Sequence, residues 1–193
     1  MRRRALPALL LACPAAARAD PALVAALRGG GHTIYLRHAI TDRSQVDTGR
    51  LHDRAGQRNL SATGEAQAST LGVAWRRLGL PLGAVLTSPV FRAQETAQLA
   101  FGADAVQVAP YLTADDYTPD AALLARNIAK IRERLGQPPA SGNDVFVGHI
   151  VPLGMVMGRS LGQAEFPEGC LAVFRPGAGF RGFLPAEVLG ASQ

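Results

Sequence analysis

Arginine and histidine side chains follow three short apolar segments of this sequence, and these residue types can bind and transfer anionic groups. Arg37 and His38 end the first segment, Arg92 follows the second and His149 follows the third. An arginine fork matches the oxygens of a phosphate, and a histidine that titrates near neutrality can attack it as a nucleophile. If the four side chains meet, they can bind and transfer a phosphoryl group. On their own, Arg37 and His38 could equally be a solvated pair at the start of a loop.

The three apolar segments have the features of buried strands, which would bring those side chains together. Residues 33–37, 84–87 and 145–147 are short apolar runs rich in β-branched residues, and glycines 29–31 precede the first of them. In a parallel sheet the carboxyl ends of the strands lie at one edge, and ligands bind in the crevice beyond that edge. We therefore expect the arginines and histidines to converge there.

Helical segments alternate with the predicted strands. Helices are predicted over residues 21–28, from about 61 to 78, from about 90 to 101, from 120 to 135, and over a short stretch from Pro152 to Gly158. The alternation predicts an α/β fold, a three-layer sandwich with a mostly parallel central sheet flanked by helices. Residues 106–108 are predicted as an edge strand, and residues 171–174 and 180–184 as a hairpin.

Two polar loops are predicted from the sequence, and the first is expected to lie over the end of the strand that carries Arg37 and His38. The first covers residues 41–59 and has no clear hydrophobic period, and the second covers residues 112–119 and contains Asp115 and Asp116. Long structured loops in a compact domain are usually functional. We therefore expect the loop of residues 41–59 and the segment of residues 102–120, which includes the second loop, to set the choice of substrate.

The first nineteen residues have the layout of a secretory signal peptide. A basic start at residues 2–4 precedes a short apolar run, and the small-x-small triplet that ends at Ala19 provides a cleavage site. We therefore expect residues 1–19 to be a signal peptide, residues 20–193 to form a single domain, and the mature protein to be periplasmic or secreted. Processing as a lipoprotein at Cys13 is a less favoured alternative, because Leu11 fits a lipobox poorly.

The excess positive charge of the chain lies in this leader. The sequence has 20 lysines and arginines, 15 aspartates and glutamates, and a net charge of +5. Four of the arginines precede residue 20, which leaves 16 basic against 15 acidic side chains. We therefore expect no nucleic-acid partner, and no later apolar run is long enough to predict a stable membrane span. Because the sequence has neither a P-loop nor a metal-binding cluster, no metal or cofactor is expected.

Four motifs, in their order along the chain, resemble the histidine phosphatase superfamily, which includes the cofactor-dependent phosphoglycerate mutases. Residues 37–39 are similar to its Arg-His-Gly/Ala signature, and residues 87–97 are similar to its Ser-Pro-x-x-Arg-Ala-x-x-Thr-Ala segment. Residues 60–68 resemble its Leu-Ser/Thr-x-x-Gly-x-x-Gln-Ala helix start, and residues 147–149 match its late Gly-His motif. The resemblance implies a phosphoglycerate mutase-like fold over most of residues 33–158.

The resemblance also implies a role for each of the four side chains. His38 would be the nucleophile that becomes phosphorylated, and His149 would stabilise charge in the transition state. Arg37 and Arg92 would hold the phosphoryl oxygens. These roles suit phosphoryl transfer, which depends mainly on positioning and electrostatic stabilisation. No metal is required, because the arginines and His149 supply the positive charge.

The resemblance leaves the proton donor for the leaving group open. The acid-phosphatase branch has an aspartate after its late histidine, where this chain has Ile150, and the mutase-like branch uses a glutamate after the second arginine. In that region this chain has Asp115 and Asp116, and either could protonate the leaving oxygen. A solvated acidic loop is the alternative. Thr41 and Arg43 are further candidates for contact with the substrate.

Together these features predict an exported phosphatase that hydrolyses a small-molecule or glycan phosphomonoester through phosphohistidine. A phosphoglycerate mutase-like phosphotransferase is one alternative, disfavoured by the export signal and by the short segment 102–120, which leaves little lid over an intermediate. A non-catalytic binder of phosphorylated envelope sugars is another, although such a protein would have no use for a nucleophile.

Overall fold

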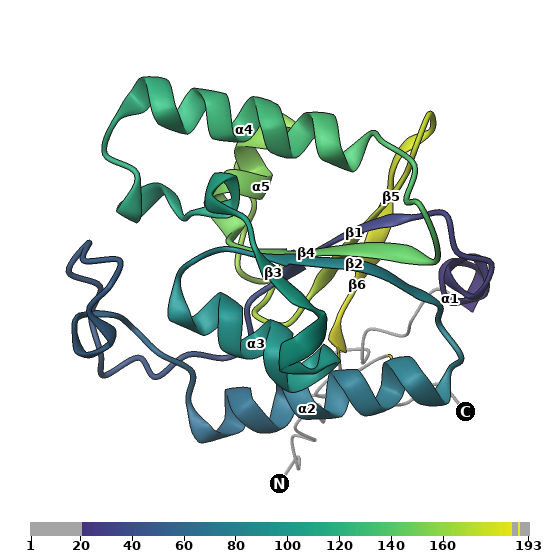
Figure 1. The fold of residues 1–193 in the computed structure, drawn as a ribbon, viewed down its shortest axis with the longest axis horizontal. Helices are drawn as coiled ribbons and strands as arrows, with labels where there is room; N and C mark the ends of the chain where they lie inside the picture. Colours follow the sequence, from purple (N-terminus) through teal and green to yellow (C-terminus); the bar gives the residue numbers. More distant parts are fainter. Residues whose placement is uncertain (1–20, 187–188, 190–193) are drawn as a thin grey trace, which may run out of the picture.

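One mixed sheet of six strands, in the order β3-β2-β4-β1-β5-β6, runs through the computed structural model, which describes residues 21–186 and 189 (Figure 1). The strands are β1 (Thr33–Arg37), β2 (Leu82–Thr87), β3 (Val106–Val108), β4 (Asn143–Gly148), β5 (Leu171–Arg175) and β6 (Gly179–Leu184). The strands from β3 to β1 are parallel, whereas β5 and β6 are antiparallel to their neighbours. The predicted mostly parallel sheet, its edge strand and its hairpin are confirmed.

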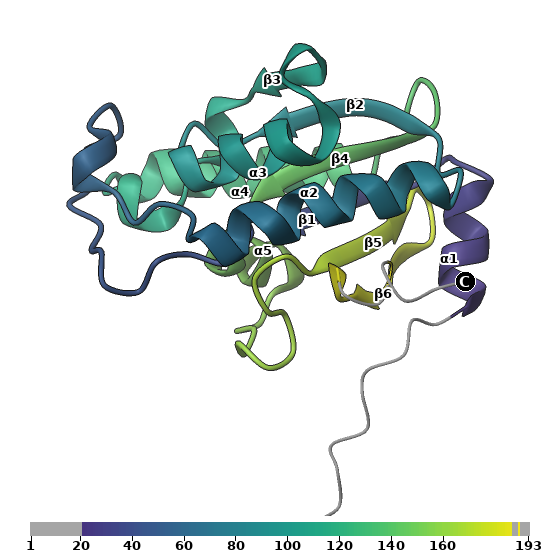
Figure 2. The same ribbon diagram turned by 90° about the horizontal axis from the view of Figure 1, so that it is seen from below.

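Helices cover both faces of the sheet (Figures 1 and 2). The helices are α1 (Pro21–Arg28), α2 (Ala62–Arg77), α3 (Phe91–Phe101), α4 (Ala121–Leu135) and α5 (Ile150–Met157). The buried sides of α1, α2 and α3 share one core, and those of α4 and α5 share the core on the other face. The predicted three-layer sandwich is therefore confirmed. Among the described residues, no helix is long and apolar enough to cross a membrane.

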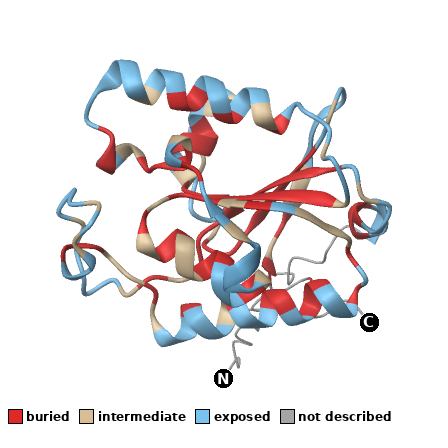
Figure 3. Ribbon diagram, viewed as in Figure 1, coloured by how far each residue is buried: buried red, intermediate tan, exposed pale blue. Residues whose placement is uncertain are grey.

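Side chains alternate across β1, so that this strand contributes to both cores. Ile34 and Leu36 lie in the core beneath α2 and α3, and Tyr35 lies in the core beneath α4 and α5. All five residues of β1 are buried, as expected for an inner strand covered on both faces. Figure 3 shows the buried residues concentrated in the strands and on the helix surfaces that face them.

The strands that precede the predicted site residues end side by side. In the parallel register, Arg37 at the end of β1 is opposite Gly148 at the end of β4, and Thr87 at the end of β2 is opposite Val147. The segments that follow the three strands therefore leave the sheet at one edge. The loop of residues 41–59 extends from this edge, at the left of Figure 1.

The helix start at α2 is fixed by a cap and by a close backbone approach. The hydroxyl of Ser61, where the predicted helix begins, accepts a hydrogen bond from the backbone N–H of Gly64 at 3.1 Å. A Cβ on residue 64 would overlap the carbonyl oxygen of Ile40, so glycine allows α2 to approach the segment that follows His38.

The two polar loops contain more regular structure than the sequence indicated. In the first loop, Arg54–Gly56 form a 3-10 turn (η1), and Thr41 pairs with Leu60 in an isolated bridge. In the second loop, Asp115–Tyr117 form another 3-10 turn (η4). Such one-turn elements are too short to show a hydrophobic period. The predicted signal peptide and Cys13 lie outside the described residues.

Candidate active site

The four side chains that the sequence singled out converge beyond the ends of β1, β2 and β4. They are almost completely buried, with relative exposures of 2% for Arg37, 3% for His38, 3% for Arg92 and 4% for His149. The two imidazole rings lie with their centroids 5.4 Å apart. The structure thus brings together groups from three separate segments, as predicted.

The ring of His38 is held in one orientation by the backbone next to it. Nδ1 lies 2.9 Å from the carbonyl oxygen of Ala39. A carbonyl oxygen only accepts hydrogen bonds, so Nδ1 must be the protonated nitrogen of the neutral ring. Nε2 then carries a lone pair, and no described residue donates a hydrogen bond to it. His38 is therefore arranged as a nucleophile that attacks through Nε2.

His149 is positioned by both its backbone and its ring. The Tyr35 hydroxyl accepts from the backbone N–H of His149 at 2.9 Å and donates to its carbonyl at 3.1 Å. Nε2 of His149 lies 2.9 Å from Oγ of Ser88, which also accepts from the backbone N–H of Val90. The Ser88 hydroxyl can then donate its proton to Nε2 of His149. In that arrangement, Nδ1 of His149 carries the ring proton. Nδ1 is enclosed and has no hydrogen-bond partner in the structure.

Arg37 is tethered at one nitrogen and leaves the rest of its fork open. Nη1 donates to Oε1 of Gln163 at 2.7 Å and to the carbonyl of Phe166 at 2.6 Å. Nε is enclosed without a partner. Burial lowers the pKa of Arg37 to about 10, against the opposing effect of the Glu168 carboxylate, so the side chain stays charged at neutral pH. The open edge of the guanidinium can therefore bind an anion.

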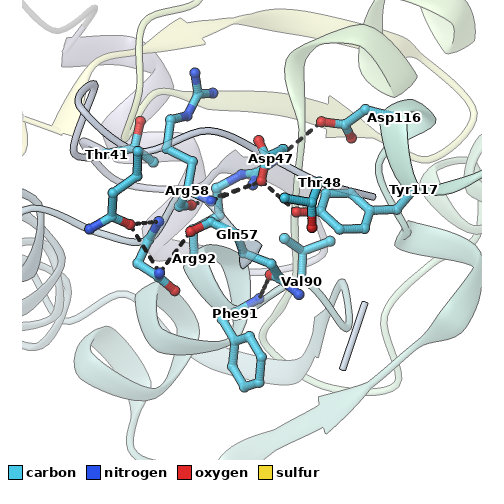
Figure 4. A network of polar contacts seen from close by, with 12 residues as sticks. Thr41, Asp47, Thr48, Gln57, Arg58, Val90, Phe91, Arg92, Asp116 and Tyr117 are labelled. Carbon is cyan, nitrogen blue, oxygen red and sulfur yellow. Dashed lines mark hydrogen bonds and ion pairs between the residues drawn. The ribbon is translucent and has the colours of Figure 1, made fainter. Parts of the chain in front are cut away.

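Arg92, in the first turn of α3, is tethered in the same way by the loop of residues 41–59. Its Nη1 donates to Oδ1 of Asp47 at 2.9 Å, and its Nε is enclosed without a partner. The same Asp47 oxygen accepts from the backbone N–H of Arg58 at 2.9 Å and from the hydroxyl of Tyr117. Figure 4 shows Asp47 at the centre of this network. Both arginines thus keep an unpaired Nε, the kind of buried donor that calls for a ligand.

The electrostatic environment keeps both histidines neutral. Burial, followed by the positive charge of Arg92, lowers the pKa of His38 well below its usual range. Burial and Arg92 lower the pKa of His149 in the same way, and His38 adds to the effect. A neutral imidazole has the lone pair that a nucleophile needs. The site therefore combines neutral histidines with charged arginines, which suits an anionic electrophile.

The two candidate proton donors differ in position. Oδ2 of Asp116 lies 3.8 Å from Nη2 of Arg92, whereas Asp115 makes no ion pair with a described residue. Partial burial raises the pKa of Asp116, Arg92 opposes this, and the carboxylates of Asp47 and Asp115 add to the increase. The Asp116 side chain is 45% exposed, so its carboxyl can exchange protons with solvent. Of the two, Asp116 is the one that an ion pair places against a site arginine, whereas Asp115 acts electrostatically on Tyr35.

Thr41 and Arg43 meet at a buried carboxylate. The Thr41 hydroxyl donates to Oε1 of Glu168 at 2.7 Å, and Arg43 lies 3.2 Å from Oε2 of the same side chain. The Glu168 side chain is only 6% exposed, whereas that of Arg43 is 69% exposed. These contacts fix the start of the loop that follows His38. Contact of Thr41 or Arg43 with a substrate stays a prediction.

Several residues at the site were not predicted from the sequence. Ser88, Asp47, Gln163, Glu168 and Arg58 all lie beside the four central side chains or carry their hydrogen bonds. Ser88 stood inside a recognised motif and directly after a predicted strand, which was a usable signal. The other four lie in loops without a pattern. Among the described residues, no group of histidines, cysteines and acids could hold a metal ion.

Comparison with known families agrees with this geometry. Residues 33–113 match the family model of the histidine phosphatase superfamily (branch 1). The match confirms the resemblance over the segments that carry Arg37, His38 and Arg92, and His149 lies beyond it. A comparison with curated protein sequences finds no match.

Solved structures of three phosphatases share the fold. The tungstate complex of the protein histidine phosphatase SixA has a TM-score of 0.57 at 15% identity, with 82% of this chain and 99% of that chain covered. The alpha-ribazole phosphatase from Shigella flexneri has a TM-score of 0.55 at 17% identity, with 80% and 96% covered. A phosphoserine phosphatase bound to 3-phosphoglyceric acid, from Entamoeba histolytica, has a TM-score of 0.55 at 14% identity, with 82% and 98% covered. At these identities the similarity establishes the fold.

Proposed function

We propose that this protein is a phosphatase that hydrolyses phosphomonoesters through a phosphohistidine formed on Nε2 of His38. The observation that carries the proposal is the contact between Nδ1 of His38 and the carbonyl of Ala39, which leaves Nε2 unprotonated beside two buried arginines. The match to the histidine phosphatase superfamily and the fold shared with three phosphatases support the same chemistry.

In the first step, Nε2 of His38 attacks phosphorus and the bond from phosphorus to the leaving oxygen breaks. Arg37 and Arg92 hold the nonbridging oxygens through Nε and the open side of each fork, and their tethered Nη1 atoms fix the forks in place. Nδ1 of His149 donates to another phosphoryl oxygen. Donors that are already oriented stabilise the charge spread over these oxygens in the transition state.

Asp116 is the proton donor in this proposal. Its raised pKa favours a protonated carboxyl that can give its proton to the leaving oxygen as the ester bond breaks. The resulting carboxylate then accepts a proton from the water that attacks the phosphohistidine. That second step releases inorganic phosphate and restores neutral His38.

The reaction needs no metal, because Arg37, Arg92 and His149 supply the positive charge and the hydrogen bonds. The protein is exported by a signal peptide in residues 1–19 and acts in the periplasm or outside the cell. There its substrate would be a small-molecule or glycan phosphate ester.

Turnover of p-nitrophenyl phosphate in the presence of a chelator tests the proposal. The wild-type protein should release equal amounts of nitrophenol and inorganic phosphate, and His38→Ala should lose about a thousandfold or more in rate. His52→Ala, in the exposed part of the loop, is the matched control and should keep full activity. An active His38→Ala variant would show that the mechanism is wrong. Binding of phosphate without any turnover would favour the non-catalytic binder instead.

A further inference from the structure

Four arginines lie in the loop of residues 41–59, and one of them differs from the others. Arg43, Arg50 and Arg54 each form an ion pair with a carboxylate. Arg58 forms none with any residue that the structure describes. Its Nε is enclosed by protein and has no hydrogen-bond partner, as is also true of Nε in the two arginines of the site. An enclosed N–H donor without an acceptor is costly, and an anion that bound beside it would remove that cost.

The backbone of Arg58 is fixed directly beside Arg92. Its N–H donates to Oδ1 of Asp47 at 2.9 Å, and its carbonyl accepts from Nη1 of Arg92 at 3.5 Å. Figure 4 shows the side chain extending away from the Asp47 carboxylate. The contacts that hold residue 58 in place are therefore made by its backbone, and they leave its side chain free for another role.

The balance of charge at the site makes Arg58 distinctive. Arg92 is offset by the Asp47 carboxylate, and Glu168 acts electrostatically on Arg37. The charge of Arg58 has no such partner among residues 21–186 and 189, and it acts on both histidines and on Arg37 by lowering their pKa values. Three guanidinium groups around two neutral imidazoles repel one another until an anion occupies the space between them.

We propose that Arg58 is a third arginine of the anion pocket, which contacts the phosphoryl group of the substrate together with Arg37 and Arg92. This inference rests on the proposed function of the site. Arg58 supplies the positive charge that is not already offset by a carboxylate, so it contributes to drawing the phosphate into the pocket. Its contact with the bound phosphoryl group also holds one end of the loop of residues 41–59 in place.

Titration calorimetry of inorganic phosphate binding tests this assignment without requiring turnover. Arg58→Gln should raise the dissociation constant of phosphate about tenfold or more, the loss expected for a charge-assisted hydrogen bond. Arg58→Lys should recover part of the affinity. Arg50→Gln is the matched control, since Arg50 lies in the same loop, is 76% exposed and pairs with Asp53. It should bind phosphate as the wild type does.

Each outcome decides the assignment. Phosphate affinity in Arg58→Gln within twofold of the wild type, with an unchanged unfolding temperature, would overturn it, and so would a wild-type protein that binds no phosphate. If Arg58→Gln unfolds, Arg58→Met, which keeps the apolar stem, is measured in its place. Hydrolysis of p-nitrophenyl phosphate is followed on the same proteins. Normal phosphate binding without hydrolysis by the wild type would overturn the proposed function, while the binding data would still decide the role of Arg58.

Discussion

Oδ1 of Asp47 lies 2.9 Å from Nη1 of Arg92, and the two side chains come from different parts of the fold. Arg92 belongs to α3, whereas Asp47 belongs to the loop that follows β1. The Asp47 carboxylate is partly buried, which opposes its ionisation, but hydrogen bonds from Tyr117 and the Arg58 backbone and the charge of Arg92 lower its pKa overall. The loop therefore takes part in forming the candidate active site.

Removal of the Asp47 carboxylate should misplace Arg92. We expect Asp47→Ala to lower kcat/KM for p-nitrophenyl phosphate by about 10- to 100-fold, the range expected for hydrogen bonds to a charged group. Asp53→Ala in the same loop, whose carboxylate is 43% exposed and lies 3.8 Å from Arg50, is the control. Steady-state kinetics of the two variants make the comparison. Equal activity in both would mean that Arg92 does not depend on this tether.

Ser88 should act on the rate through His149. Its hydroxyl is completely buried and lies 2.9 Å from Nε2 of His149, so Ser88→Ala removes the group that orients the ring and selects its protonated nitrogen. We expect kcat to fall about tenfold while KM changes little. Ser69→Ala, which removes an exposed hydroxyl on α2, should leave both constants unchanged. A change confined to KM would contradict this role.

The leaving group should reveal whether Asp116 donates a proton. Nitrophenolate leaves without protonation, whereas an alkoxide requires it. We therefore expect Asp116→Asn to slow hydrolysis of an alkyl phosphate at least about tenfold more than hydrolysis of p-nitrophenyl phosphate. Asp115→Asn provides the adjacent control and should slow both substrates equally or not at all. The same loss on both substrates in Asp116→Asn would exclude it as the acid.

Stability should decrease in mild acid because both site histidines have depressed pKa values in the folded state. Below about pH 6.5, the unfolded chain binds protons at these two residues and the folded chain does not. The free energy of unfolding should then fall by about 1.4 kcal/mol per pH unit for each histidine, and this contribution is fully present above that pH. Denaturant unfolding between about pH 5 and 8 measures the slope.

His38→Gln isolates that effect from other titrating groups. With only one site histidine left, the decrease in stability that the two histidines cause should be about half as steep as in the wild type. An unchanged slope would mean that His38 titrates in the folded protein much as it does in the unfolded chain.

The main elements of the fold were predictable because each has a local physical cause. Apolar runs such as 33–37 and 145–147 form inner strands of the sheet. Ser61 caps the start of α2, and Asp120 caps the start of α4. The convergence of Arg37 and His149 followed from the parallel register of the strands that precede them. These features depend on the period of apolar residues, on helix capping and on strand direction, which can all be recognised in one sequence.

Four of the residues that complete the site, all of them in loops, could not be predicted, because their contacts depend on segments far apart along the chain. Gln163 lies 126 residues after Arg37, whose Nη1 it binds, and Glu168 lies 127 residues after Thr41. Asp47 and Arg58 lie in a loop without a hydrophobic period, and their positions depend on the tertiary fold. Capping and strand patterns carry no information about such pairs.

In the proposed mechanism, Nε2 of His38 carries the phosphoryl group during turnover. Rapid acid-free quenching of the wild-type protein with a phosphate ester, followed by mass spectrometry or ³¹P NMR, tests this most directly. We expect one phosphate per chain, attached to Nε2 of His38 and absent from His38→Ala. A protein that turns over the ester with no phosphate on His38, or with phosphate on another residue, would contradict it.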